Sequence, residues 1–301
     1  MSETVKFGIV GAGVFGGYHA NKLTAHPRIA FIGVNDAKMQ GAQNLASKHN
    51  VRAFESFELL LAEVDAVIIA TPARLHGLLA VQALEAGKHC LVEKPIAAEL
   101  EQAQRIIELA QAHKLIVQIG HQERFVAQAI GLDKVPERPL KINACRLGPP
   151  SGRGGDVSVT LDLMSHDIDL VLMLMGEMPD RVTGQTRSEN TPFSDETHAR
   201  LSFGDTQVTL QASRLAPSYK RVMEITYPSG QAIIDFNAKT LSHDTPFDLN
   251  ANFAESPAAK DSLGAATDRF VNAILGQADV MVSAQDGYKA LKLALQIDES
   301  A

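Results

Sequence analysis

The sequence predicts an α/β domain followed by an α+β domain. Over the first 121 residues, short continuous apolar runs alternate with longer amphipathic stretches, whereas many later segments alternate apolar and polar residues. Apolar strands separated by helices are typical of a parallel sheet covered on both faces, and alternating strands are typical of an antiparallel sheet with one wet face. A chain of 301 residues also fits two domains, at about 150 residues each.

The first domain is expected to span residues 1–121 and to consist of strands joined by helices. Its predicted strands are Val5–Val10, Ile29–Val34, Ala66–Ala70, Cys90–Val92 and Ile116–Ile119. Its predicted helices are Ala37–His49, His76–Ala86 and Leu100–His113. In a doubly wound sheet of this kind, ligands bind outside the carboxyl ends of the strands, so residues that directly follow strands are the first candidates for a site.

The second domain is expected to span residues 122–301. A long apolar helix over Val159–Met175 precedes a block of predicted strands, and this order favours an α+β arrangement. The strands are Arg181–Arg187, His198–Phe203, Gln207–Ser213, Arg221–Tyr227 and Gln231–Phe236.

The end of the chain is expected to hold a long loop and two helices. The segment Asn237–Asp261 is polar and carries two prolines, which predicts a loop of unusual length. The helices are predicted over Ala265–Leu275 and Ala284–Glu299. Ser283 and Asp286 resemble a capping box at the start of the last helix.

Composition and charge exclude several classes of protein. Hydrophobic residues make up 45% of the chain and charged residues 21%, which is ordinary for a globular protein rather than a disordered one. The 28 basic and 35 acidic residues give a net charge of −7, which argues against a nucleic-acid partner bound through its phosphates. No apolar stretch is long enough to predict a membrane span.

Cysteine and histidine spacing predicts a reducing compartment and no metal site. Cys90 and Cys145 cannot form a disulfide framework or a four-thiolate zinc site. Neither a Cys-x-x-Cys nor a His-x-x-x-His spacing occurs. Residues 1–5 show neither the basic nor the apolar region of a secretory signal, so we expect a cytoplasmic protein.

Residues 11–16 carry the strongest single motif. The segment Gly11-Ala12-Gly13-Val14-Phe15-Gly16 fits G-x-G-x-x-G, follows an apolar strand and opens a helical stretch. Gly11 permits a tight turn, Gly13 lets the backbone approach a pyrophosphate, and Gly16 lets the helix pack closely on the strand. Because free N–H groups at the helix N-terminus then face the phosphate, the motif predicts a dinucleotide site that includes Val14 and Phe15.

Asp36 predicts which dinucleotide binds. It lies 20 positions after Gly16, at the end of the second apolar run. A carboxylate there accepts hydrogen bonds from the adenosine ribose hydroxyls and repels a 2′-phosphate, which favours NAD. Lys38 leaves NADP open, because a cation two residues further along the chain can neutralise a 2′-phosphate.

Two further segments follow strands at the edge where ligands bind. Glu93-Lys94-Pro95 follows the fourth predicted strand, and Thr71-Pro72, with His76 beyond it, follows the third. The carboxyl ends of parallel strands meet at one edge of a sheet, so these segments are expected to lie close to the bound dinucleotide.

Polar residues past the fifth strand and on the long apolar helix are candidates for ligand contacts. Asp162, His166 and Asp169 are spaced i, i+4 and i+7, which places them within about 60° of one another on a helix. Such a stripe is costly unless it lines a polar cavity or is paired, and a satisfied buried His–Asp pair is the structural alternative. Gln122 is a candidate nicotinamide contact, and Arg124 is either a substrate contact or a structural salt-bridge partner.

Together these motifs resemble the Gfo/Idh/MocA family, the glucose–fructose oxidoreductase and inositol dehydrogenase group. The resemblance covers nearly the whole chain and depends on the order and spacing of the motifs. It runs through Gly11–Gly16, Thr71-Pro72 with His76, Ala86–His89 leading into Glu93–Pro95, Gly120–Phe125, Asp162–Asp169 and Asp286-Gly287. The family implies a Rossmann domain and an α+β domain with a large open, mostly antiparallel sheet. It also implies NAD(P)-dependent hydride transfer to or from a secondary alcohol of a sugar, cyclitol or sugar nucleotide, and homodimers or homotetramers packed through that sheet.

The resemblance assigns roles to three residues. Lys94 matches the family's catalytic or substrate-binding lysine, and Asp162 and His166 match its Asp-x-x-x-His pair. The chain departs from the family pattern because it lacks the usual glycines just before Asp162 and between it and His166. The amino-acid sequences of residues 162–169 and of Glu123-Arg124-Phe125 most resemble those of the branch that acts on UDP-N-acetyl-hexosamines as 3-dehydrogenases.

These residues predict how an alcohol would be oxidised. A hydride must reach the nicotinamide and a proton must leave the hydroxyl, and the protein supplies the proton acceptor. His166 suits that role because imidazole titrates near neutral pH, and Asp162 is expected to orient its ring. Lys94 is expected to stabilise the developing alkoxide, with proton transfer as a second possibility. Arg124 and Asp169 complete the predicted substrate site.

A catalytically silent NAD(H)-binding regulator is the alternative interpretation, because a fold does not by itself determine function. The joint presence of Lys94, Asp162 and His166 favours catalysis. A regulator or sensor would bind NAD(H) and show no turnover with any polyol or sugar.

Overall fold

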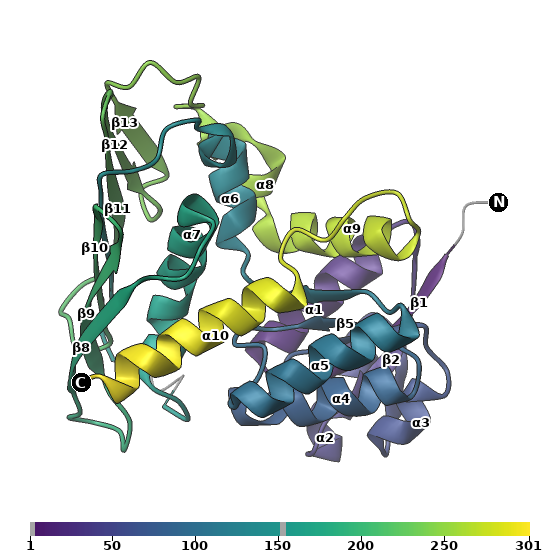
Figure 1. Ribbon diagram of the computed structural model, residues 1–301. Helices are drawn as coiled ribbons and strands as arrows, with labels where there is room; N and C mark the ends of the chain where they lie inside the picture. Colours follow the sequence, from purple (N-terminus) through teal and green to yellow (C-terminus); the bar gives the residue numbers. More distant parts are fainter. Residues whose placement is uncertain (1–3, 151–154) are drawn as a thin grey trace. The chain divides into compact units, whose positions relative to one another are not determined.

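The computed structural model describes residues 4–150 and 155–301, which divide into two compact units (Figure 1). The first unit comprises the chain up to Gln122 together with Leu263–Tyr288. The second unit comprises Glu123–Ser262 together with Lys289–Ala301. Each unit has its own sheet.

The sheet of the first unit is parallel and has the strand order β3-β2-β1-β4-β5-β6. This order is that of a Rossmann fold, so the predicted fold is confirmed. The strands are β1 (Val5–Val10), β2 (Ile29–Asn35), β3 (Arg52–Phe54), β4 (Ala66–Ile69), β5 (His89–Val92) and β6 (Val117–Ile119). The helices between them are α1 (Val14–Ala25), α2 (Met39–His49), α3 (Phe57–Leu61), α4 (His76–Glu85) and α5 (Leu100–His113). β3 and α3 were not predicted from the sequence, because three and five residues are too few to show a period.

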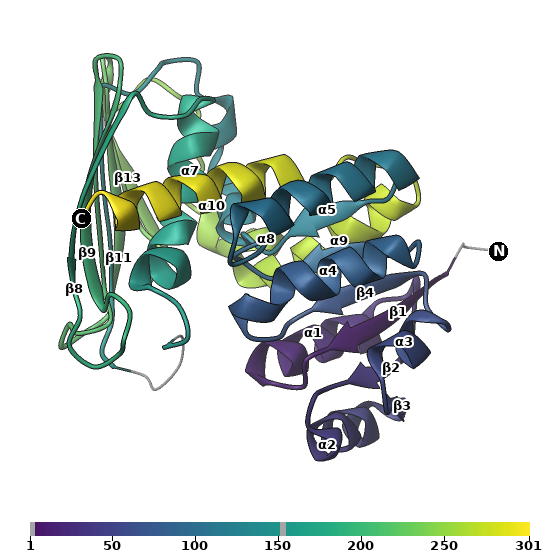
Figure 2. The same cartoon turned by 60° about the horizontal axis from the view of Figure 1, so that its bottom comes forward.

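Helices cover both faces of this sheet, as its continuous apolar strands predict. Helices α4 and α5 pack against each other, and Figure 2 shows them side by side over the strands. Apolar residues of α1, α2 and α9 (Ser262–Ile274) share one core with residues of β1, β2 and β4. The ligand-binding edge of the sheet is therefore carried by a scaffold packed on two sides.

Helix α9 returns to the first unit after the chain has built the second. Phe270 and Val271 are fully buried in the same core as Phe7, and the ring centroids of Phe7 and Phe270 lie 5.8 Å apart. Residues 122–301 were expected to form one second domain, whereas Leu263–Tyr288 belongs to the first unit. The apolar face of a helix does not tell which core it will cover, so the local pattern could not show this return.

The second unit is built on a sheet with the strand order β13-β12-β11-β7-β10-β9-β8. β7 and β10 run parallel and the other neighbouring strands run antiparallel, which confirms the predicted mostly antiparallel sheet. The strands are β7 (Lys141–Leu147), β8 (Arg181–Arg187), β9 (Glu196–Phe203), β10 (Thr206–Ser213), β11 (Lys220–Tyr227), β12 (Gly230–Asp235) and β13 (Thr240–His243). Its helices are α6 (Glu123–Ile130), α7 (Ser165–Met175), α8 (Pro257–Lys260) and the end of α10 (Ala284–Glu299). Figure 1 shows α7 over one face of this sheet.

The segment Asn237–Asp261 contains elements where the sequence analysis expects a long loop, so that expectation is wrong. β13 pairs antiparallel with β12, and Pro257 opens α8. The N-cap Ser256 accepts a hydrogen bond from the Ala259 N–H, and Phe253 is fully buried. Elements of about four residues leave no period that a sequence pattern can show.

The start of α10 has the predicted capping box. Ser283 donates through its backbone N and its Oγ to Asp286 Oδ2, at 2.9 and 2.7 Å, and the Asp286 N–H donates to Ser283 Oγ at 3.1 Å. In the next turn, a Cβ on Gly287 would lie 2.8 Å from Ile119 Cγ1, which explains why the helix carries a glycine there.

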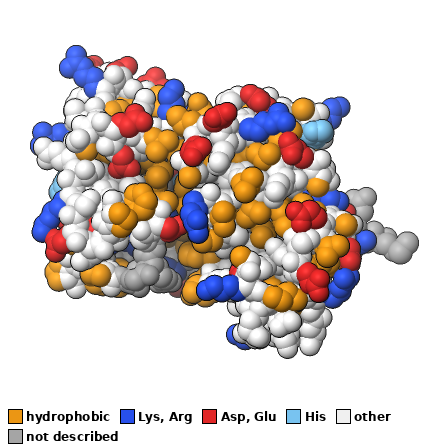
Figure 3. Space-filling model, turned by 90° about the horizontal axis from the view of Figure 1, so that it is seen from below, with side chains coloured by type: hydrophobic (Ala, Val, Ile, Leu, Met, Phe, Trp, Pro, Cys, Tyr) orange, Lys and Arg blue, Asp and Glu red, His pale blue; other side chains and the backbone are white. Residues whose placement is uncertain are grey.

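Each helix in the described part of the chain is too short or too polar to cross a membrane. On the face shown in Figure 3, Lys and Arg side chains are interspersed with Asp and Glu. This mixed surface matches the composition of the chain, which has 28 basic and 35 acidic residues.

Candidate active site

The turn between β1 and α1 has the geometry that its glycines predict. Gly11 has a φ of +102°, and a Cβ on it would lie 2.5 Å from the Ala70 carbonyl oxygen. A Cβ on Gly16 would lie 1.9 Å from the Gly11 carbonyl oxygen, so only glycine fits at either position. Gly13 is the N-cap of α1, and within the described residues nothing lies within 4 Å of its Cβ position. This open position leaves room for a pyrophosphate against the helix N–H groups.

The two residues that follow Gly13 are open to a ligand. Val14 is 49% exposed and Phe15 is 44% exposed, at the first turn of α1. The Phe15 ring packs edge-on against Tyr18, with centroids 5.9 Å apart. Both predicted residues therefore present apolar surface beside the turn, as a dinucleotide contact requires.

Asp36 follows β2 and is tied to the glycine turn. Its Oδ2 accepts a hydrogen bond from the Ala12 N–H and its Oδ1 accepts one from the Lys38 N–H, both at 2.7 Å. These bonds fix a half-buried carboxylate in the position that suits two ribose hydroxyls and repels a 2′-phosphate. Lys38 is exposed, and its backbone N–H is the group that contacts Asp36. The turn and Asp36 thus fit a dinucleotide of the NAD type.

His76 connects two loops at the carboxyl ends of the strands. Its Nδ1 lies 2.7 Å from the Pro95 carbonyl oxygen and its Nε2 lies 2.8 Å from the Thr71 carbonyl oxygen. The residue is 2% exposed. This geometry favours a structural role over the cofactor contact that the sequence predicts, because both ring nitrogens are occupied by backbone. Thr71 is half-buried and Pro72 is exposed.

Glu93 is a buried carboxylate directly before Lys94. It lies 2.7 Å from His19 Nε2, and Gln122 Nε2 is 3.5 Å from the same oxygen. Burial alone would raise the pKa of Glu93, but the hydrogen bond from His19 and the charges of His19, Lys94 and His76 lower it below its usual value. Glu93 is therefore a buried anion, whereas the neighbouring Lys94 is half-buried.

Asp162 and His166 occupy the junction of two helix types in the second unit. The helix predicted over Val159–Met175 begins as a π-helix, Thr160–Met164, and continues as α7. The spacing of 100° per residue assumed for the stripe does not hold across that junction. Asp162 and His166 are half-buried, with the His166 side chain 20% exposed. Helices with π geometry are frequent at functional sites, and here the π-helix carries the candidate aspartate.

Asp169 departs from the predicted stripe and pairs with Arg124. The guanidinium Nε and Nη2 of Arg124 donate to the two carboxylate oxygens of Asp169, both at 2.8 Å. The side chains are 9% and 1% exposed. A bidentate pair buried this deeply matches the structural alternative considered for Arg124, and it joins α6 to α7.

A second buried ion cluster was not predicted from the sequence. Arg146 on β7 donates to Asp167 Oδ1 and Oδ2 at 2.9 and 3.0 Å, and to both carboxylate oxygens of Glu123. Glu123 Oε1 in turn lies 4.0 Å from His166 Nδ1. Buried and half-buried residues alternate along β7, which puts Arg146 on the same face as Ile142. That alternation is the sequence signal that could have revealed an inward-facing arginine.

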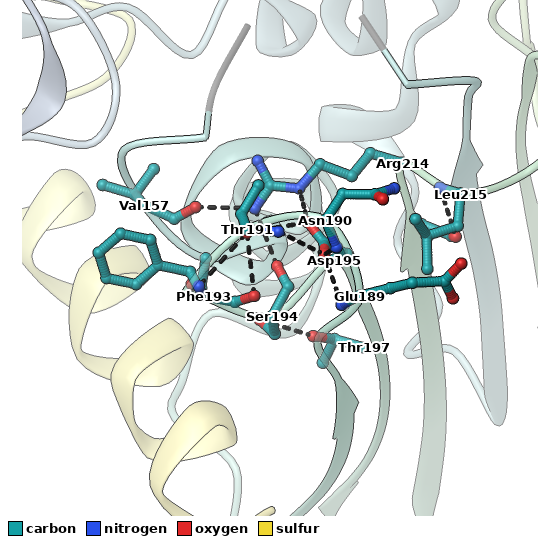
Figure 4. A network of polar contacts seen from close by, with 12 residues as sticks. Val157, Glu189, Asn190, Thr191, Phe193, Ser194, Asp195, Thr197, Arg214 and Leu215 are labelled. Carbon is teal, nitrogen blue, oxygen red and sulfur yellow. Dashed lines mark hydrogen bonds and ion pairs between the residues drawn. The ribbon is translucent and has the colours of Figure 1, made fainter. Parts of the chain in front are cut away.

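The segment before the π-helix is held by a network around Arg214 (Figure 4). Arg214 Nη2 donates to the carbonyl oxygens of Val157 and Ser194, both at 2.8 Å, and Arg214 Nε lies 3.0 Å from Asp195 Oδ1. Asp195 also accepts hydrogen bonds from the backbone N–H groups of residues 189–191. The network thus ties the chain entering the π-helix to the loop between β8 and β9.

Asp298 holds the first turn of the π-helix from α10. It accepts hydrogen bonds from Ser158 Oγ at 2.6 Å and from Thr160 Oγ1 at 2.5 Å. Thr160 Oγ1 also lies 2.9 Å from Thr197 Oγ1 on β9. These contacts join residues far apart in the sequence, so no local pattern could reveal them.

Family comparisons fit this geometry. Residues 5–121 match the oxidoreductase family with an NAD-binding Rossmann fold, and residues 146–233 match the GFO/IDH/MocA C-terminal domain. A UDP-N-acetylglucosamine 3-dehydrogenase of Acidithiobacillus ferrooxidans is 34% identical over 310 residues, covering 97% of this chain and 96% of that protein. The chain belongs to the Gfo/Idh/MocA oxidoreductase family. This membership confirms the prediction that the protein is an NAD-dependent oxidoreductase.

Other relatives place this member within the Gfo/Idh/MocA family. A crystal form of the A. ferrooxidans enzyme superposes with a TM-score of 0.90 at 33% identity, covering 99% of this chain and 98% of that one. An inositol 2-dehydrogenase of Paracoccus denitrificans is 30% identical over 187 residues, covering 58% of this chain and 55% of that protein. The WlbA dehydrogenase of Bordetella pertussis, solved with NADH and UDP-GlcNAcA, shares the fold, with a TM-score of 0.87 at 19% identity, covering 100% of this chain and 96% of that one.

Among residues 4–150 and 155–301, no cluster of three His, Cys, Asp or Glu side chains is arranged to hold a metal ion. The candidate catalytic residues are divided between the two units. Lys94 belongs to the Rossmann unit of this family member, whereas Asp162 and His166 belong to the sheet unit.

Proposed function

We propose that this protein oxidises a secondary alcohol of a UDP-linked N-acetylamino sugar, with NAD as the hydride acceptor. The similarity to UDP-N-acetylglucosamine 3-dehydrogenase carries the proposal, because 34% identity extends over 97% of the chain. The similarity to an inositol 2-dehydrogenase covers 58% of the chain. A sugar nucleotide is therefore favoured over a free cyclitol.

The Rossmann unit is proposed to hold the dinucleotide through backbone N–H groups and one carboxylate. The N–H groups at the N-terminus of α1, beside Gly13, would hold the pyrophosphate, and Asp36 would bind the adenosine ribose. Val14 and Phe15 would contact the phosphates, and Thr71, Pro72 and Gln122 would contact the nicotinamide half. Glu93 and His76 support these contacts through the loops that they brace.

The proposed chemistry divides one oxidation between three side chains. When bound, NAD supplies the acceptor for the hydride that leaves the substrate carbon. His166 takes the hydroxyl proton, since its side chain is partly exposed and imidazole transfers protons near neutral pH. Asp162 helps to orient that ring. Lys94 donates to the substrate hydroxyl oxygen and stabilises the developing alkoxide.

In this proposal, Arg124 and Asp169 do not contact the substrate. They fix the helices that carry the residues of the site. Each neutralises the other inside the second unit, and their pairing fixes α6 against α7. The sequence-based prediction of direct substrate contacts is thus narrowed to Lys94, Asp162 and His166.

A substrate screen with the purified protein tests this function. NADH formation would be followed with UDP-N-acetylglucosamine, UDP-N-acetylgalactosamine, myo-inositol and free hexoses at matched concentrations. We expect turnover with a UDP-N-acetylamino sugar and a 3-keto product detected by mass spectrometry. Turnover restricted to myo-inositol would instead support the cyclitol function that the inositol 2-dehydrogenases suggest. Saturable NADH binding without turnover on any of them would support a regulator.

We further propose that two or four copies assemble through the sheet of the second unit. Along β9, buried and exposed residues alternate, so one sheet face packs inward while His198 and Arg200 point outward. On the neighbouring strand β10, Thr209 pairs with Arg200 and is likewise exposed, so the outward face extends over both strands, which suits a face-to-face contact between copies. Light scattering coupled to gel filtration should give a dimer or tetramer mass, and a monomer mass would contradict the proposal.

A further inference from the structure

The carboxylate of Glu123 is fixed beside the candidate base. Glu123 is the first residue of α6, and its Oε1 lies 4.0 Å from His166 Nδ1 on α7. Arg146 Nη1 donates to the same Oε1 at 2.6 Å, and Arg146 Nη2 contacts Oε2. The side chain of Glu123 is only 16% exposed, so it has little freedom to turn away. Its position is therefore set by the guanidinium rather than by solvent.

Arg146 is shared between two carboxylates. It is 2% exposed and donates to Asp167 as well as to Glu123. Burial alone would lower the pKa of Arg146, but Asp167 and Glu123 raise it above its usual value. Burial raises the pKa of Asp167, and the contact with Arg146 opposes that rise. One guanidinium shared by two carboxylates cannot neutralise both, so the cluster beside His166 carries a net negative charge.

Other charged groups surround His166 on the elements packed against α7. Arg124 on α6 is committed to Asp169, as a bidentate pair. Asp162 lies on the π-helix that runs into α7. Arg221 on β11 acts on Asp167 electrostatically, and the short helix Leu132–Lys134 carries Asp133 and Lys134, both exposed. The Glu123 carboxylate lies within ion-pair distance of the His166 ring.

We propose that Glu123 is a positioning residue that holds the His166 ring through its Nδ1 edge and stabilises the protonated ring during the reaction. The inference rests on the proposed role of His166 as proton acceptor. The 4.0 Å separation exceeds a hydrogen bond, so the interaction is a through-space attraction that strengthens when the ring gains a proton. With Nδ1 directed to Glu123, Nε2 is the nitrogen that receives the substrate proton. Arg146 and Asp167 fix the carboxylate in this arrangement.

Glu123→Gln tests the role of the charge. The amide keeps the shape and one acceptor for Arg146 but removes the negative charge. The protonated ring then loses a partner, so the His166 titration midpoint should move to lower pH by about one unit. Histidine NMR in the absence of substrate measures this, with the His166 signal assigned by its loss in His166→Ala. In turnover assays, kcat should fall about 10-fold and the acid limb of the kcat/KM profile should move in the same direction.

Two further variants separate electrostatics from folding. Glu123→Asp retains the charge and should keep the titration midpoint near that of the wild type even if kcat falls. Glu177→Gln removes a carboxylate from the exposed ion pair with Arg138 in the same unit and should change neither readout. Thermal unfolding and NAD binding would verify that each variant is folded.

The outcomes distinguish this inference from the proposed function. An unchanged His166 midpoint in Glu123→Gln overturns the role of Glu123, whatever the substrate. A shifted midpoint in a protein that oxidises no sugar nucleotide supports the Glu123–His166 coupling and contradicts the proposed reaction. If Glu123→Gln is unfolded, a Glu123→Asp midpoint lowered by about one unit overturns the role, and one near the wild type supports it.

Discussion

The polar clusters of the two units differ in whether backbone groups or side chains form them. In the Rossmann unit, the backbone dominates, because His76 lies between the carbonyl oxygens of Thr71 and Pro95 and glycines shape the ligand turn. Around α6 and α7 of the sheet unit, side chains pair with side chains, as in the buried contact of Arg124 with Asp169. Backbone geometry is local and leaves motifs in the sequence, whereas buried ion pairs join distant residues. The first kind of site should be sensitive to steric change and the second to unbalanced charge.

The largest expected effect comes from breaking a side-chain pair in the sheet unit. Arg124→Ala leaves Asp169 buried at 1% exposure without its partner, and such a loss typically destabilises by about 3–5 kcal/mol. Arg187→Ala is the matched control, because its ion pair with Glu189 is largely exposed and should contribute at most about 1 kcal/mol. Chemical denaturation of both variants measures the difference, and equal stability would contradict the contrast between the units.

A steric change in the Rossmann unit should act on binding. A Cβ on Gly16 would lie 1.9 Å from a backbone oxygen, so Gly16→Ala must displace the turn and should weaken NADH binding about 100-fold, equivalent to about 2.7 kcal/mol. Gly17→Ala is the matched control, because it makes the same substitution one residue away and, within the described residues, nothing lies within 4 Å of its Cβ position. It should bind NADH normally. Equal binding by both variants in a fluorescence titration would show that the turn is not the dinucleotide site.

Asp195 is an exception to this contrast, because backbone N–H groups hold this carboxylate inside the sheet unit. Burial opposes its ionisation, but hydrogen bonds from Glu189, Asn190 and Thr191 hold the pKa of Asp195 at about 2. A depressed folded-state pKa gives stability that is present above the unfolded value, near ~3.9, and is lost as pH falls through about 2. Asp195→Asn should remove about 2 kcal/mol at pH 6.

The same variant should also change how stability depends on pH. Between about pH 4 and 2, the wild type should lose more unfolding free energy than Asp195→Asn, because only the wild type gains a proton at this site. Urea denaturation at several pH values gives both slopes. Parallel slopes for the two proteins would mean that another carboxylate governs this range.

The smallest expected effect concerns cofactor choice. Asp36→Ala removes the carboxylate held by Ala12 and Lys38, so the ratio of kcat/KM for NAD to that for NADP should fall about 10-fold. Lys38→Ala should leave that ratio within about twofold, because the structure ties the backbone of Lys38, not its charge, to Asp36. A wild-type preference for NADP, or a large loss of NADP use in Lys38→Ala, would reverse the assignment.

The contrast between the units also explains what sequence patterns could predict. The glycine turn and Asp36 were predictable because their spacing is local and each glycine has a steric reason. Arg146 was missed because β7 was missed, and its partners lie on two other elements. The stripe of Asp162, His166 and Asp169 was only partly right, since a π-helix changes the angular spacing and Asp169 turns to Arg124. The return of α9 depends on which core its apolar face meets.

His166 is the residue on which the proposed reaction depends, and its replacement is the most direct test. Steady-state NADH formation from UDP-N-acetylglucosamine should be measured for the wild type and His166→Ala, with NADH affinity as the control. The account predicts that kcat falls about 100-fold or more while NADH affinity stays within about twofold, because His166 lies outside the Rossmann unit. A His166→Ala enzyme that retains near-normal kcat would contradict the assignment of His166 as the proton acceptor.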